Sequence, residues 1–248
     1  MTGDAGADRG GRTTLGGPPR QALTRERIIE AAIDFVDRQG LTALTMRGLG
    51  KELGVEAMSL YRHVNGREDL LEGIVDRLIG NLHPRPGEGE LGPVDGWQAY
   101  LQWLAHGVRA LVVDHPKVFP LIATRHPAAP WLRPPLRSLE VVEEFLTTLM
   151  ERGFSDERAV MAYRSFTSFL LGHLLLEASV LGARTAPAEE PLDEGDSDVP
   201  NADQAVELKD FPHLQRLEPM LSEDHARAEF ERALEDLLDR IDRTITEE

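Results

Sequence analysis

The stretch from residue 45 to residue 71 constrains the fold of this chain more than any other part of the sequence. Its apolar spacing predicts a helix over about 45–53, a turn at Gly54 and a second, short helix over about 57–63. Glycine adopts the left-handed conformation at a helix end without a side-chain clash, which suits Gly54 to the turn. Gly50 is small where the two helices should cross. The apolar residues expected on the inner faces are Leu49, Leu53, Val55, Leu60 and Val64.

The second of these helices should present a short, hydroxylated, aromatic and partly basic face. Small side chains let a helix approach base pairs closely in the major groove, and Tyr and Arg reach bases and phosphates. This pattern favours a helix-turn-helix that binds DNA, although a helical hairpin inside a larger helical core has the same pattern. The residues expected on the outward face are Ala57, Met58, Ser59, Tyr61, Arg62 and His63.

Composition limits the class of protein. A chain of 248 residues can bury one large core or two small ones. No cysteine occurs, which excludes disulfides, thiolate metal sites and cysteine nucleophiles. Because there is no run of about 18 apolar residues and no apolar N-terminal segment, we expect a cytoplasmic protein that does not associate with membranes. Helical periodicity dominates the sequence and predicts an all-α fold.

The net charge of −16 is unusual for a protein that binds DNA, but it is unevenly distributed. Residues 1–82 hold 11 basic and 12 acidic residues, whereas residues 83–248 hold 16 and 31. A nearly neutral DNA-binding part must concentrate its cations on one face. The acidic remainder should suppress nonspecific binding to nucleic acid.

A dense series of residues surrounds the two short helices: Leu44, Thr45, Arg47, Leu49, Leu53, Gly54, Val55, Leu60, Tyr61, His63, Val64, Arg67, Leu70 and Leu71. This series resembles the TetR family of transcriptional regulators. The resemblance implies a homodimer that binds a palindromic operator in double-stranded DNA, most often a repressor released by a small-molecule effector. It implies that Arg47 approaches the groove and that Ala57, Met58, Ser59 and Tyr61 face base edges. It also implies that Tyr61, His63 and Arg67 hold the DNA backbone. Arg62 should contact either a base or a phosphate.

A boundary at about residue 24 separates an N-terminal tail from the first domain. Residues 1–23 are rich in glycine and almost without apolar side chains, so we expect a disordered tail whose arginines are either solvated or close to phosphates. Residues 24–82 should form the DNA-binding domain. Its first helix should begin at the N-cap Thr24 and end at Gly40. Arg25 either binds a phosphate or is solvated.

The last helix of this domain, over about 65–82, should connect it to the rest of the chain. Asn65 followed by Glu68 has the spacing of a capping box. The resemblance implies that a displacement of this helix changes the spacing of the two DNA-binding heads. Residues 83–248 should form a ligand-binding and dimerisation domain, in which residues 183–221 form an acidic loop.

The expected helices of the second domain run over about 95–114, 116–125, 131–153, 155–182 and 223–246. Ser155 and Ser222 should cap the last two. The segment 166–181 is apolar nearly all the way round, and the last helix has an apolar stripe. The two helices either pair with their twins in a four-helix dimer interface or close a monomeric bundle, and the resemblance favours the dimer. The stripe consists of Phe230, Ala233, Leu234, Leu237, Leu238, Ile241 and Ile245.

The second domain resembles the tetracycline-repressor branch of the family, which binds its drug together with magnesium. His83 matches a drug-binding histidine of that branch, but the metal-binding histidine falls at about Leu121, and Leu offers no lone pair. We therefore expect no metal, no cofactor and no magnesium–tetracycline complex, but a small, largely apolar ligand. The expected apolar lining is Trp103, Leu104, Val108, Leu121, Phe145, Phe169 and Leu176. The expected polar anchors are His83, Thr124, Arg125 and His173, with Glu177 next to His173; solvated helix ends and a buried polar pair are the alternatives for these residues.

Two other classes of function bear on this interpretation. An enzyme needs a nucleophile with a base, or a metal cluster, and the eight histidines are scattered without a metal-binding or phosphate-binding motif, so we expect no enzyme. The main alternative is a helical module that sequesters a ligand or binds a protein without binding DNA. Salt dependence distinguishes them, because a DNA-binding dimer loses affinity steeply as salt rises.

Overall fold

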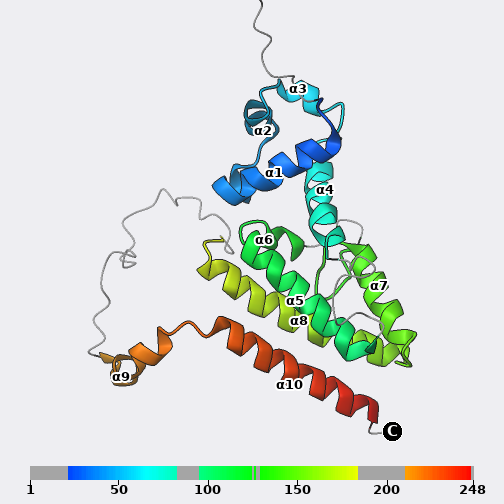
Figure 1. The fold of residues 1–248 in the computed structure, drawn as a ribbon, viewed down its shortest axis with the longest axis vertical. Helices are drawn as coiled ribbons and strands as arrows, with labels where there is room; N and C mark the ends of the chain where they lie inside the picture. The colour runs from blue at the N-terminus through cyan, green and yellow to red at the C-terminus, as the bar shows by residue number, and fades with distance from the viewer. Residues whose placement is uncertain (1–21, 83–94, 125, 127–128, 184–209, 247–248) are drawn as a thin grey trace, which may run out of the picture.

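The structure is a computed structural model and describes residues 22–82, 95–124, 126, 129–183 and 210–246. The ordered elements in these ranges are all helices, as the sequence predicts. The predicted tail, up to residue 21, lies outside the described residues, as do His83, Arg125 and most of the acidic loop. Figure 1 shows a small N-terminal group of helices at one end, joined through α4 to a larger helical body.

The N-terminal group has one core, which α1, α2, α3 and α4 share. Thr24 caps α1 by accepting a hydrogen bond from the amide of Arg27, and Gly40 ends it at a φ of 85°. The fully buried side chains of this core include Ile28, Ala32, Val36, Leu49, Leu60, Leu70 and Ile74. The bounds are Arg25–Gln39 for α1, Leu41–Ala43 for a short 3-10 turn, Met46–Glu52 for α2, Ala57–Leu60 for α3 and Arg67–Gly80 for α4.

The crossing of α2 and α3 depends on Gly50. A Cβ atom at this position would lie 3.0 Å from the carbonyl oxygen of Val55 and 3.1 Å from the amide nitrogen of Ala57. Gly54 turns the chain at a φ of 67°. The second helix is shorter than predicted, because the amides of His63 and Val64 both donate to the carbonyl of Leu60 and close the helix there. Tyr61, Arg62 and His63 therefore lie in the turn after α3.

The body is a bundle centred on α8, which packs against α5, α7 and α10. Length and mean hydropathy would allow α8 to cross a membrane, but its buried side chains belong to the core of this bundle. Ser155 caps α8, as predicted. Two predicted helices are shortened by proline: α7 begins only after Pro134 and Pro135, and α6 is a single turn that contains Pro120. The bounds are Trp97–Asp114 for α5, Phe119–Ile122 for α6, Leu139–Met150 for α7 and Asp156–Val180 for α8.

The C-terminal part departs from the prediction in two ways. The expected acidic loop ends in a helix, α9 (Pro212–Leu221), which has no buried residue and stands apart from the body in Figure 1. Ser222 ends α9 by donating to the carbonyl of Glu218 at 2.7 Å, instead of capping the next helix. Asp224 takes that role and accepts from the amide of Ala226 at 3.0 Å.

The stripe of α10 (Ala226–Thr246) is not an exposed face. Four of its residues, Phe230, Leu234, Leu238 and Ile241, are at most 4% exposed within a single chain, and Leu237 is half-buried. They pack against α8 and α5. This corrects the expectation that the stripe itself meets a second copy, because the apolar side chains are already covered by their own body. The exposed apolar residues of the neighbouring helix α8 are instead Val160, Met161, Leu176 and Val180.

Candidate DNA-binding surface, ligand cavity and domain junction

The residues predicted to contact DNA lie on α2, on α3 and the turn that follows it, and at the start of α4. Met58 is 72% exposed and Tyr61 is 46% exposed, which is unusual for large apolar side chains on a single chain. Arg47, Arg62 and Arg67 are also exposed. Ala57, Ser59 and His63 are half-buried, and they bring the α3 backbone close to the surface.

Three ion pairs within the N-terminal domain hold arginines that lie away from α3. The pairs are Arg38 with Glu52 at 2.8 Å, Arg77 with Glu30 at 2.6 Å and Arg25 with Asp69 at 2.7 Å. Within the described residues, no ion pair involves Arg47, Arg62 or Arg67. The cations near α3 are therefore available to phosphates, which gives a nearly neutral domain one basic face. Glu56, which precedes α3, makes no side-chain cap and remains an exposed anion on that face.

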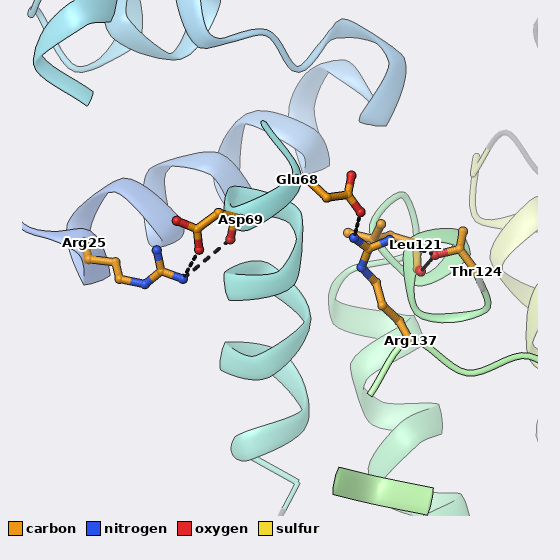
Figure 2. Close-up of polar contacts among 6 residues, drawn as sticks. All are labelled: Arg25, Glu68, Asp69, Leu121, Thr124 and Arg137. Carbon is orange, nitrogen blue, oxygen red and sulfur yellow. Dashed lines mark hydrogen bonds and ion pairs between the residues drawn. The ribbon is translucent and has the colours of Figure 1, made fainter. Parts of the chain in front are cut away.

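Neither of the two roles considered for Arg25 is found. Its guanidinium donates to the carboxylate of Asp69 at 2.7 Å, and so joins the start of α1 to the start of α4 (Figure 2). The hydrogen bond from Arg25 lowers the pKa of Asp69, and a second hydrogen bond from the amide of Asn65 adds to this effect. The capping box predicted from Asn65 and Glu68 does not form, because the N-cap of α4 is Gly66 and the amide of Asn65 donates to Asp69 instead.

A cavity of about 50 Å³ lies inside the body, between the end of α4 and the helices α5 to α8. Its lining is apolar except for Tyr163 and Thr167, and both of these are buried. Three of the predicted lining residues are present: Leu104, Val108 and Phe145. The other lining residues are Ile79, Leu82, Phe119, Ile122, Leu136, Val141, Phe166, Leu170 and Leu171.

Four residues predicted to line the pocket lie elsewhere. Leu121 is buried but outside the lining, Trp103 stacks on Tyr100 at 6.4 Å, and Phe169 stacks on Phe230 at 5.9 Å. Leu176 is 73% exposed, so its prediction as a lining residue is wrong. The segment 166–181 is apolar on nearly all sides, so its sequence does not show which side faces inward, and the structure turns Leu170 and Leu171 toward the cavity instead.

The predicted polar residues that the structure describes, Thr124, His173 and Glu177, also lie outside the cavity lining. Thr124 donates its hydroxyl hydrogen to the carbonyl of Leu121 at 2.6 Å. The ring of His173 packs against Phe230 with 5.3 Å between centroids. Glu177 does not pair with His173, because both of its oxygens accept from Arg109, at 2.5 and 3.1 Å.

The two domains meet at the first turn of α4, where two neighbouring carboxylates point in different directions. Asp69 binds Arg25 of α1, whereas Glu68 binds Arg137, which precedes α7 in the body (Figure 2). Arg137 is 6% exposed, and its guanidinium also donates to the hydroxyl of Thr124 at 3.4 Å. Its backbone amide donates to the carbonyl of Ile122, a cavity residue, at 3.3 Å. The first turn of α4 is thus held from both sides.

A second contact joins the far end of α1 to the body. Asp37 and the Nδ1 atom of His115 lie 2.6 Å apart, and Lys117 donates to the carbonyl of Arg38 at 3.2 Å. Sequence reasoning missed this contact and the one through Arg137. The partners in both are about 70 or more positions apart, and no local pattern marks them.

Comparisons with known proteins agree in both domains. The family described as bacterial regulatory proteins, tetR family, matches residues 28–74. The family described as tetracyclin repressor-like, C-terminal domain, matches residues 88–245.

Individual relatives include the HTH-type transcriptional repressor DrrR1 of Streptomyces coeruleorubidus, which is 33% identical over 66% of this chain and 57% of its own length. The chain therefore matches little more than half of that repressor. The tetracycline repressor protein class E of Escherichia coli is 29% identical over 62% of this chain and 69% of its own. The crystal structure of a possible TetR family transcriptional regulator from Streptomyces coelicolor A3(2) superposes with a TM-score of 0.65 at 29% identity, over 89% of this chain and 99% of the other.

Proposed function

Because the chain belongs to the TetR family of transcriptional regulators, we propose that it is a homodimeric, cytoplasmic repressor of transcription that a small, largely apolar ligand releases from DNA. Residues 24–82 form the DNA-binding unit in this proposal, and residues 83–248 form the unit for ligand binding and dimerisation. The observation that carries the proposal is the exposed basic and aromatic face around α3, whose arginines have no carboxylate partner among the described residues.

In the complex with DNA, α3 enters the major groove, and the residues around it make different kinds of contact. Arg47 can donate two hydrogen bonds to a guanine, and Met58 and Ala57 can make only apolar contacts such as those to a thymine methyl group. The remaining contacts to bases and phosphates come from Ser59, Tyr61, Arg62, His63 and Arg67. One such helix reads few base pairs, so two copies on a palindromic operator are needed for specificity.

The ligand enters the cavity between α4 and the helices of the body. Pockets for small molecules usually measure about 300–1,000 Å³, so a cavity of about 50 Å³ must enlarge when the ligand binds. The apolar lining supports an apolar ligand. The proposal excludes the magnesium–tetracycline complex, because Leu121 at the metal-ligand position is a buried hydrocarbon.

Enlargement of the cavity reaches the DNA-binding domain by two routes. Ile79 and Leu82 line the cavity at the end of α4. A ligand that enlarges the cavity there therefore displaces this helix directly. At the other end of α4, Leu136 lines the cavity and adjoins Arg137, which holds Glu68. A displacement of α4 changes the separation of the two heads of the dimer, and coupling of this kind amounts to about 1–3 kcal/mol.

The outer face of α8 supports the dimer. Leu176 and Val180 are 73% and 86% exposed, and Gly172 and Ser168 lie one and two turns before Leu176 on exposed positions. Small residues beside exposed apolar ones allow two helices to approach closely. In a symmetric dimer, the same face serves both copies.

The test is an electrophoretic mobility shift on the DNA that flanks the protein's own gene, with competitor DNA and a series of salt concentrations. A specific complex with dimer stoichiometry is expected, and its affinity should fall with salt in proportion to the phosphates contacted. Arg47→Ala and Tyr61→Ala should each weaken specific binding at least about tenfold and leave the dimer intact. Arg240→Ala, which removes an exposed charge from α10, is the control.

Normal footprints from both head variants would show that the reading face is assigned wrongly. If no DNA is retained even in a selection from random sequences, the alternative function applies, in which the chain sequesters a ligand or binds a protein without contacting DNA.

A further inference from the structure

A second hollow, of about 430 Å³, lies on the outside of the body between α7, the first half of α8 and the segment 131–133. It is a groove and not an enclosed cavity, and one of its walls is formed by Trp131, which is 72% exposed. The floor is apolar and comes mainly from Leu139, Val142 and Leu146 of α7. A tryptophan held beside an apolar floor offers a flat surface to a flat molecule.

The groove carries the charges that the inner cavity lacks. Arg133 and Arg164 both line it, against a single carboxylate, that of Glu143. Arg133 is held in place because its guanidinium donates to the carbonyls of Pro130 at 2.6 Å and of Leu132 at 2.9 Å. In the part of the chain that the structure describes, neither arginine has a carboxylate partner. The groove is therefore an electropositive site in a strongly acidic domain, and guanidinium groups suit planar anions such as carboxylates.

Tyr163 lies between the groove and the inner cavity, since it belongs to the lining of both. Its hydroxyl donates to the carbonyl of Pro134 at 3.0 Å, and its ring meets Phe145 edge-on at 5.7 Å. A turn of this ring would join the two spaces. Their combined size then falls in the usual range for a small-molecule site, which the inner cavity alone does not reach.

We propose that the groove is the outer half of the effector site and that the effector is an aromatic organic anion. Its carboxylate or acidic phenol binds Arg133 and Arg164, its flat part lies against Trp131, and its apolar end passes Tyr163 into the inner cavity. This inference rests on the proposed function, and it adds the chemical class of the ligand and the residues that select it.

The experiment compares two fluorescent probes of the same shape, anthracene-2-carboxylate and the neutral anthracene-2-carboxamide, by anisotropy titration of the full chain. The acid should bind at least about tenfold more tightly than the amide, because a hydrogen bond to a charged group is stronger than a neutral one. In Arg133→Gln/Arg164→Gln this preference should fall to within about twofold. Trp131→Ala should weaken both probes and leave the preference unchanged, because the ring contact does not depend on charge.

Arg232→Gln is the matched control, since it removes one positive charge from the exposed face of α10, outside the groove. It should keep the preference of the wild type. Equal binding of acid and amide, binding of neither probe, or an unchanged preference in the double variant would each overturn the inference. A mobility shift on operator DNA with the same preparations separates the two proposals. A chain that shifts DNA but does not select the acid refutes only the groove, and a chain that selects the acid but binds no DNA refutes the proposed function.

Discussion

Asp69 shows how a single carboxylate at a helix start can serve two purposes. It accepts from the amide of Asn65 at 2.6 Å and from Arg25 at 2.7 Å, and so holds both the residue before the N-cap of α4 and the start of α1. The residues proposed to contact DNA lie on α2, on α3 and up to Arg67 at the start of α4, so their position relative to α1 depends on this contact. Arg25 binds Asp69 in the structure, whereas its place in the sequence suggested a phosphate contact or a solvated side chain.

The ion pair between Arg25 and Asp69 should make stability depend on acid pH. The pKa of Asp69 is lowered by Arg25, so the pair stabilises the fold above the pKa of the unfolded carboxyl and loses this effect as pH falls through the lower, folded pKa. Asp69→Asn should cost about 0.5–1 kcal/mol at neutral pH, a modest amount because the pair is partly exposed to solvent. Urea unfolding at pH 7 and at about pH 3 should show a smaller difference in stability between the wild type and the variant at the lower pH. A difference at pH 3 as large as that at pH 7 would mean that Asn fails to accept from the amide of Asn65, and not that the ion pair is lost.

At the scale of the element, the α2–α3 crossing depends on close backbone contact. Gly50→Ala should destabilise the domain by about 1–3 kcal/mol, because the new methyl group would meet backbone atoms of Val55 and Ala57 that cannot turn away. Gly80→Ala is the control, since a Cβ atom there meets nothing within 4 Å and the residue ends a helix. Thermal unfolding measures both. A Gly50 variant as stable as the Gly80 variant would contradict the tight crossing.

The helix α4 should loosen at its start when either partner of its ion pair to the body is removed. Arg137→Gln and Glu68→Gln should each raise the hydrogen-exchange rates of amides in the first turn of α4, and the double variant should add little, because both remove the same contact. Arg232→Gln, distant from this junction, should leave these rates unchanged. Additive effects of the two variants would show that Arg137 and Glu68 act independently of each other.

At the scale of the whole molecule, the outer face of α8 should decide whether the protein is a dimer. Leu176 is 73% exposed in a single chain and would be buried between the two chains of the dimer. Leu176→Glu would therefore place a charge in that interface. Sedimentation should show a monomer, and operator affinity should fall at least about tenfold because each head then binds its half-site alone. Met150→Glu, at the end of α7 and 42% exposed, should remain a dimer. A dimeric Leu176 variant would place the interface elsewhere.

How far the sequence predicts this molecule depends on the kind of contact. Helix ends with local signals were predicted correctly, as at Thr24, Gly40 and Ser155, because the capping group lies within a few residues of the amide that it satisfies. Contacts between distant parts were not, and Arg137 is the clearest case, since its partner Glu68 lies 69 positions away. The cavity lining was predicted only in part, because an all-apolar helix such as α8 gives no indication of which side faces inward.

The helix α9 has a consequence for how the chain acquires its final secondary structure. Isolated helices shorter than about 12–15 residues are marginal in water, because nucleation costs more entropy than so few hydrogen bonds recover. With 10 residues, an internal proline and no buried side chain, α9 is not covered by any part of the chain that the structure describes. Its exposed Phe211, Leu214, Met220 and Leu221 would find that support on a second copy. Circular dichroism should therefore record a helical content that rises with protein concentration, since α9 is expected to become stable when two copies of the chain associate.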